Sequence, residues 1–127
     1  MHSRIFNLLA VVLLLGGTAF AHHAFSNEFD DTKPVTLEGV VTQINWENPH
    51  VYFYVDVKES DGTVVNWACE TRGPSGLARR GWKRDSLKIG DKVVVTGFRA
   101  RNGTHTADGR QVSMADGRKI LSGSTNY

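Results

Sequence analysis

Apolar and polar residues alternate along the stretch from Trp46 to Arg72, and this alternation predicts a β-hairpin. In its first half every second residue is apolar, at Val51, Phe53, Val55 and Val57. In its second half the same spacing returns at Val65, Trp67 and Cys69. A period of two is typical of a strand with one buried face, so each half is predicted to form one strand of the hairpin.

The length of the connection between these strands predicts their register. A loop of two or four residues would set Val57 opposite Asn66 and mix core and solvent residues on one face. A loop of three residues, 60–62, with Gly62 in the left-handed conformation, matches apolar residues with one another. The pairs that it produces are Val57 with Val65, Val55 with Trp67, and Phe53 with Cys69.

The remaining pattern predicts a long first strand, a short helix and three later strands. The first strand covers residues 35–46, and its apolar positions change phase near Gly39, which favours a β-bulge there. Pro74 and Gly81 are typical of the first residue of a helix and of the position just past its end, so a helix is predicted over 74–80. The later segments are a strand at 92–101 with a bend at Gly97, a mobile loop at 101–109, and strands at 110–114 and 118–121.

This order of elements predicts an all-β fold, a small Greek-key barrel of five to six strands with one short helix between strands three and four. It is the order of the oligonucleotide/oligosaccharide-binding (OB) fold, and an open antiparallel sandwich is the alternative. The expected organisation is an N-terminal arm at 22–34, the barrel at 35–121 and a frayed tail at 122–127. Phe25 and Phe29 of the arm, and Trp82 after the helix, are candidates to dock on the barrel.

The first 21 residues have the pattern of a signal peptide. Arg4 supplies a positive charge, residues 8–15 are apolar but too few to span a bilayer, and the sequence Ala19-Phe20-Ala21 fits a cleavage site. We therefore expect an exported protein, periplasmic or secreted. The residue directly after the cleavage site is His22 rather than a cysteine, and no later stretch is apolar enough to span a bilayer, so no membrane anchor is expected after cleavage.

Charge and cysteine content narrow the classes of partner and chemistry. Removing Arg4 lowers the formal net charge from +2 to +1, so the processed chain is nearly neutral, and no nucleic-acid partner is expected. The basic residues at positions 79, 80, 83 and 84 are interpreted as a solvated helix and loop rather than an anion site. Cys69 is the single cysteine, so no intramolecular disulfide forms, and its predicted inward position indicates a packing role.

The outer face of the predicted hairpin is the candidate ligand-binding face. Polar and aromatic residues gather on it and on the adjoining connection: Trp46, His50, Tyr52, Tyr54, Glu70 and Arg72. Aromatic side chains on this face of an OB-type barrel can stack on sugars or bases. The partner class stays open among a small molecule, a glycan and a protein. The plainer interpretation is an ordinary solvated face with tyrosines chosen for strand propensity.

A metal site is the second candidate, and processing would create it. Cleavage after Ala21 leaves His22 at the N-terminus, where its amine and ring nitrogen can chelate Cu(II). His23 or His50 would supply a third nitrogen, and His105 is a weaker candidate. If this metal site exists, its cofactor is copper. If it does not, no cofactor is expected. The plainer interpretation is that two histidines after a cleavage site have no metal role.

An enzyme is the least favoured class. The sequence lacks a Ser-His-Asp arrangement that stands out, a phosphate-binding glycine loop and an HExxH motif. The carboxylates Glu28, Asp30 and Asp31 fall in the predicted arm and are interpreted as solvated rather than catalytic. We therefore expect a non-catalytic protein.

Several short motifs together resemble a family of small exported bacterial proteins that is catalogued only as a domain of unknown function. The motifs are the start His22-His23-Ala24-Phe25, the segment 34–39, Asn48-Pro49-His50, Asn66-Trp67-Ala68, Gly81-Trp82, Arg84-Asp85-Ser86-Leu87, and the strand entry 90–93 with Gly97. The resemblance implies an exported, barrel-like domain without an assigned activity. It also implies that His22, His23 and His50 are candidate functional positions. The function expected from the sequence is an exported binding or accessory module, with periplasmic copper binding as the alternative.

Overall fold

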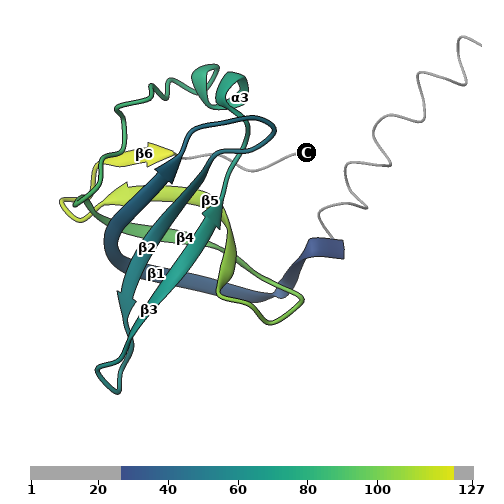
Figure 1. Ribbon diagram of the computed structural model, residues 1–127, viewed down its shortest axis with the longest axis vertical. Helices are drawn as coiled ribbons and strands as arrows, with labels where there is room; N and C mark the ends of the chain where they lie inside the picture. Colours follow the sequence, from purple (N-terminus) through teal and green to yellow (C-terminus); the bar gives the residue numbers. More distant parts are fainter. Residues whose placement is uncertain (1–26, 122–127) are drawn as a thin grey trace, which may run out of the picture.

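The computed structural model describes residues 27–121, whose strands close into a ring (Figure 1). The elements in chain order are β1 (Phe29–Asn45), β2 (Tyr52–Lys58), β3 (Val64–Glu70), α3 (Pro74–Ala78), β4 (Lys92–Ala100), β5 (Thr106–Met114) and β6 (Lys119–Leu121). The strand order is β3-β2-β1-β4-β5-β6, and a parallel pairing of β3 with β5 closes the ring. The prediction of a small all-β barrel with a short helix between the third and fourth strands is confirmed. The predicted signal peptide, the arm through residue 26 and the tail at 122–127 lie outside the described residues.

The β2–β3 hairpin has the predicted register. Val57 pairs with Val65, Val55 with Trp67, and Phe53 with Cys69. Gly62 has a φ of 87°, and its amide donates a hydrogen bond of 3.0 Å to the carbonyl oxygen of Glu59, as a three-residue bulged turn requires. The inward residues Phe53 and Val55 are fully buried, so this hairpin supplies one wall of the core.

β1 differs from the prediction at its start and in the position of its bulge. It begins at Phe29, six residues before the predicted start, because Phe29 pairs with Ala100 of β4 and is buried. The register with β2 shifts between Val41 and Gln43 rather than at Gly39. Gly39 has another role, because an added Cβ there would lie 2.1 Å from the carbonyl oxygen of Asp56 on β2.

The predicted mobile loop at 101–109 is wrong over its second half. β5 begins at Thr106, and the segment 106–108 pairs with Ala68, Cys69 and Glu70 of β3 in parallel, as well as with β4. Ala107 and Asp108 are buried. The composition suggested a loop, but pairing on both sides satisfies the backbone of these residues and outweighs their weak strand propensity.

The segment after β3 covers one end of the barrel. α3 is shorter than predicted, and its Leu77 is fully buried. Trp82 folds back as expected, and its Nε1 donates a hydrogen bond of 2.6 Å to the carbonyl oxygen of Ile120. Figure 1 shows α3 beside the β1–β2 connection, with the β2–β3 turn at the other end of the barrel. Over residues 27–121, helices are too short or too polar to cross a bilayer.

The Cys69 thiol is predicted to be unreactive in the folded protein. Its side chain is fully buried on β3, and burial raises the pKa of the thiol to about 12, so the reactive thiolate is scarce. We expect a colorimetric disulfide reagent at pH 8 to label Cys69 in urea but not in the native state. Rapid, complete labelling of the native protein would contradict the position of Cys69 in the core.

Candidate functional site

A hollow of about 240 Å³ lies between the β1–β2 connection and α3. We call it the lip hollow. The side chains that line it and carry polar groups are Asn48, His50, Arg72, Ser75 and Arg79. Pro49, Gly73 and Gly76 complete its walls. Two segments far apart in sequence therefore meet at this end of the barrel and line a polar hollow that is open to solvent.

Backbone hydrogen bonds hold the two walls of the lip hollow together. The Val51 amide donates to the Arg72 carbonyl oxygen at 3.0 Å, and the Thr71 amide donates to the Val51 carbonyl oxygen at 2.9 Å. Gly73 allows the closest approach, because an added Cβ would lie 2.4 Å from the carbonyl oxygen of Pro49. The lip hollow is therefore framed by paired backbone rather than by free loops.

His50 is oriented by a buried carboxylate. Its ring Nδ1 is hydrogen-bonded to Oε1 of Glu70, with the ring nitrogen as the donor. The His50 side chain is 42% exposed, whereas Glu70 is only 5% exposed. Tyr52 lies opposite Glu70 on β2, and burial, followed by a hydrogen bond to Glu70, raises the pKa of its phenol. Glu70 thus anchors the imidazole ring of His50 at the lip hollow and the phenol ring of Tyr52 beside it.

Glu70 also has unfilled hydrogen-bonding capacity. Its Oε2 is buried and lacks a donor among the described residues. The Glu28 carboxyl lies nearby, just before β1, and hydrogen-bonds Glu70 when it carries a proton. Burial first, and then repulsion from Glu70, raises the pKa of Glu28, while the charge of His50 lowers it. Asp108 of β5 adds a further, smaller repulsion, although its own carboxylate is paired with Arg110 at 2.7 Å.

This arrangement predicts that Glu28 makes stability fall as the pH rises. Because the folded-state pKa of Glu28 is above its ordinary value of 4.5, the folded state holds the proton more tightly, and its stabilising contribution is lost as the pH rises through the folded-state pKa. Glu28→Gln should therefore be more stable than wild type at pH 7, with the difference shrinking towards pH 4. Urea unfolding at both pH values measures it, with Glu47→Gln as control. A constant difference across this range would contradict the coupling.

The structure separates the residues of the predicted binding face. His50 and Arg72 line the lip hollow, and Glu70 and Tyr52 lie behind His50. Trp46 instead stacks on Trp82, with ring centroids 6.5 Å apart and an interplanar angle of 18°. Tyr54, half-buried opposite Ala68, is not among the residues that line the hollow.

Four polar residues of this site are not predicted from the sequence, and the first is Asn48, which belongs to the β1–β2 connection. Ser75 and Arg79 reach the lip hollow from α3 and its C-terminal end, a meeting with the β1–β2 connection that no local pattern signals. Glu28 was assigned to a solvated arm, yet it lies beside Glu70. The burial of Glu70 itself was also not predicted, because strand alternation places it on the outer face.

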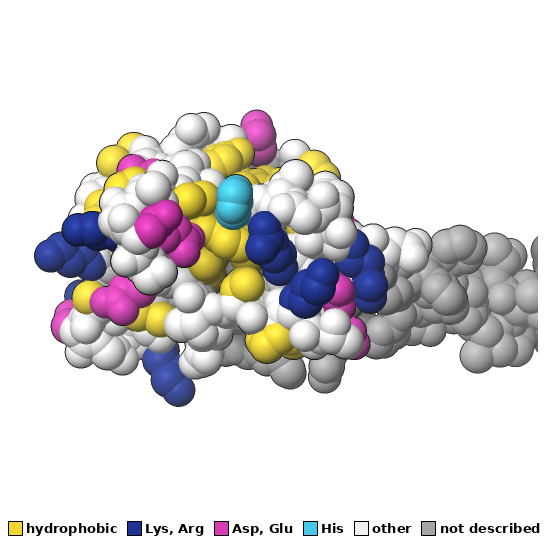
Figure 2. Space-filling view, turned by 90° about the horizontal axis from the view of Figure 1, so that it is seen from below, with side chains coloured by type: hydrophobic (Ala, Val, Ile, Leu, Met, Phe, Trp, Pro, Cys, Tyr) yellow, Lys and Arg dark blue, Asp and Glu magenta, His cyan; other side chains and the backbone are white. Residues whose placement is uncertain are grey.

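A second polar cluster surrounds the connection between β4 and β5. His105 lies edge-on to the Trp67 ring with centroids 5.1 Å apart, and the Arg99 guanidinium lies 5.4 Å from the same ring centroid. Figure 2, viewed from the end opposite α3, shows a histidine among hydrophobic side chains with Lys and Arg side chains beside it. His105 is thus packed on an aromatic residue of β3.

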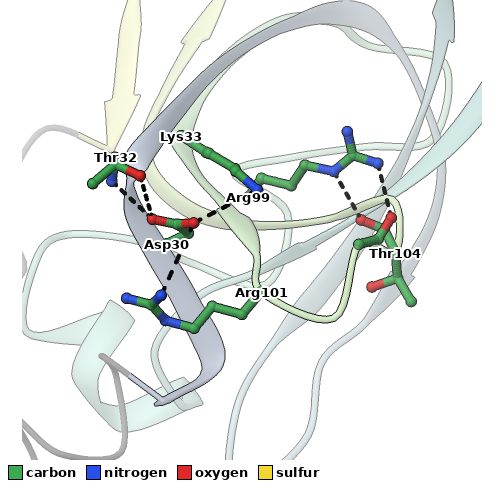
Figure 3. Close-up of polar contacts among 7 residues, drawn as sticks. Asp30, Thr32, Lys33, Arg99, Arg101 and Thr104 are labelled. Atoms are coloured by element: carbon green, nitrogen blue, oxygen red, sulfur yellow. Dashed lines mark hydrogen bonds and ion pairs between the residues drawn. The ribbon is translucent and has the colours of Figure 1, made fainter.

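Asp30 ties this connection to the start of β1, and Arg99 holds the connection to β4 (Figure 3). Arg99 donates from Nη2 to the Gly103 carbonyl oxygen at 2.8 Å. Asp30 accepts hydrogen bonds from the hydroxyl and amide of Thr32, which hold the pKa of its carboxyl below the ordinary value, and it pairs with Arg101 at 3.9 Å. These contacts give Asp30 a structural role.

Metal ligation by the described residues alone is not supported. Within 27–121, no group of three His, Cys, Asp or Glu side chains is close enough to hold a metal ion. His22 and His23, the other members of the predicted copper site, lie outside the described residues. The described part of that site is His50 with its carboxylate partner.

Residues 10–110 match the model of a family of unknown function (DUF6152). Curated proteins and solved structures give no match to the chain.

Proposed function

Because the chain belongs to the DUF6152 family of unknown function, we propose its role from the lip hollow: it is an exported, non-catalytic module that binds a small ligand there. The observation that carries this proposal is the pairing of half-exposed His50 with buried Glu70 at the wall of the hollow. A buried carboxylate that fixes a side chain at a surface hollow prepares that side chain for contact with a ligand.

Two further features support binding rather than catalysis. Cys69 is buried with a raised pKa, so its thiolate is scarce, and the sequence has no Ser-His-Asp arrangement that stands out. The signal-peptide pattern at 1–21 supports export to the periplasm or the medium. The order of strands and helix resembles that expected of OB-type barrels, in which the connection between the first two strands takes part in binding, and this resemblance supports a binding role for the lip hollow.

A thermal-shift experiment tests this proposal with four probes of different charge: inorganic phosphate, acetate, glucose and ethanolamine. We expect at least one probe to raise the melting temperature of the wild type. Arg79→Ala should abolish the shift without unfolding the protein, because Arg79 is exposed. Tyr54→Ala, on the same outer face but outside the hollow, is the matched control and should keep the shift. Absence of any shift, or an equal shift in Arg79→Ala, would refute binding at the lip hollow.

Copper binding through the processed N-terminus is the second candidate. Histidine ligands commonly donate their second ring nitrogen to a carboxylate, and His50 makes this contact with Glu70, leaving Nε2 for a metal. Glu28, near the first residue that the structure describes, lies beside this His50–Glu70 pair. His23 precedes Glu28 by five residues, which span at most about 17 Å, so His22 and His23 are within reach of His50.

Two versions of the processed chain test this candidate. One begins at His22, and the other carries one extra residue in front of it, which removes chelation by the terminal amine and ring. Calorimetric titration with Cu(II), with electron paramagnetic resonance spectra, should show tight binding that is lost on extension and weakened by His50→Ala. Equal, weak binding by both versions would refute copper binding through the processed N-terminus and would not affect the proposal that a ligand binds in the lip hollow.

A further inference from the structure

The lining of the lip hollow indicates which chemical group it takes. Arg72 and Arg79 are cationic, and His50 becomes cationic on protonation. Asn48 and Ser75 add N–H and O–H donors. Aspartate and glutamate side chains are missing from the described residues that line it. A concave surface with donors and positive charge favours an anion.

We propose that the lip hollow binds an oxyanion, the carboxylate or phosphate group of a small ligand, between Arg72 and Arg79. This inference rests on the proposed function and adds the charge class of the ligand. Guanidinium groups suit it, because their planar fork of donors matches the oxygens of carboxylate and phosphate. The hollow measures about 240 Å³. Since a water molecule occupies about 30 Å³ in the liquid, an oxyanion and part of the molecule that carries it fit.

The structure holds the stem of Arg72 and the backbone of Arg79 in place at the hollow. The stem of Arg72 lies against Gly76, where an added Cβ would be 3.2 Å from Cβ and 3.4 Å from Cδ of Arg72. Arg79 follows α3 directly, and α3 is held to the core by fully buried Leu77. A side chain that is held in place loses less entropy when it binds, so the packed stem of Arg72 favours recognition, and Arg79 adds a second guanidinium from the end of α3.

His50 completes the site from the opposite wall. Because Glu70 holds Nδ1, the oxyanion meets the His50 ring through Nε2, which donates a hydrogen bond when the ring is protonated. The hydroxyl of Ser75 and the amide of Asn48 donate from either side.

Calorimetric titrations of the full chain with inorganic phosphate and with acetate, at constant ionic strength, test the inference. Arg72→Gln and Arg79→Gln should each lower the affinity for the anion about tenfold, because each removes one charge-assisted hydrogen bond. Arg84→Gln is the matched control: Arg84 belongs to the same basic run and is exposed, but it does not line the hollow. The anion that binds more tightly identifies the ligand group as tetrahedral phosphate or planar carboxylate.

Two results would overturn the inference: binding of neither anion, or equal weakening by Arg84→Gln and Arg79→Gln, which indicates diffuse surface charge. Its failure can be told apart from failure of the proposed function. If glucose or ethanolamine raises the melting temperature in an Arg79-dependent manner while neither anion binds, the lip hollow remains a binding site and only the oxyanion assignment is lost.

Discussion

Gly97→Ala is expected to destabilise the barrel by about 3 kcal/mol or more, a large part of the stability of a typical small domain. Gly97 lies on β4 where the register with β5 shifts, and an added Cβ would lie 1.5 Å from the carbonyl oxygen of Asp108. The neighbouring backbone has no flexible end that can move aside, so β4 and β5 must separate. Because Asp108 also pairs with Glu70, the separation strains the β3–β5 contact that closes the ring. Urea unfolding followed by tryptophan fluorescence measures the loss.

Gly62→Ala is the matched comparison for Gly97→Ala. Gly62 has a φ of 87°, and an added Cβ there would meet no atom within 4 Å. Its substitution therefore costs only the left-handed backbone strain, about 1–2 kcal/mol. If Gly97→Ala lowered the free energy of unfolding no more than Gly62→Ala does, this would contradict the close approach of β4 and β5 at Gly97.

Leu77→Ala is expected to cost about 2–5 kcal/mol and to abolish ligand binding at the lip hollow. Leu77 is the buried residue of α3, and its removal leaves a cavity between α3 and the barrel. Ser75, Gly76 and Arg79 flank Leu77 in sequence and line the hollow. Loosening of α3 would therefore displace these three residues and disrupt the site. Urea unfolding and the four-probe thermal-shift experiment measure the two effects.

Leu87→Ala separates loss of stability from loss of the site. Leu87 is 3% exposed and packs in the same core, but it belongs to the connection after α3. Its truncation should cost a similar free energy of unfolding and leave binding by the folded protein intact. Retained binding in Leu77→Ala, or lost binding in Leu87→Ala, would show that α3 does not position the hollow.

The parts of the fold that sequence predicts well are those with one buried face. In the β2–β3 hairpin, a slip of one residue would turn Phe53 and Trp67 towards solvent, so the alternation determines the register. The start of β1 and the segment at 106–109 lack such alternation. Their positions depend on backbone pairing with β4 and β3, which residue types do not encode. The predicted bulge near Gly39 rests on the shared parity of Val40 with Ile44 and Trp46, but Val40 is 37% exposed and the register shifts after Val41.

The candidate site is predictable to the extent that it lies on one strand or connection. The outer-face alternation and the Asn48-Pro49-His50 connection identify His50, Glu70 and Arg72. The approach of α3 to that connection, which adds Arg79, follows from the path of the chain after β3. The contact of Glu28 with Glu70 joins residues far apart in sequence. A pattern with a period of two carries no information about either contact.

An NMR titration of the isotopically labelled full chain tests the location of the binding site most directly. The ligand is whichever of phosphate, acetate, glucose and ethanolamine raises the melting temperature most. We expect the largest amide shift changes to cluster within residues 48–50 and 72–79, on the two walls of the lip hollow. Largest changes at 99–106, around Trp67 and His105, or changes spread evenly over the barrel, would contradict it.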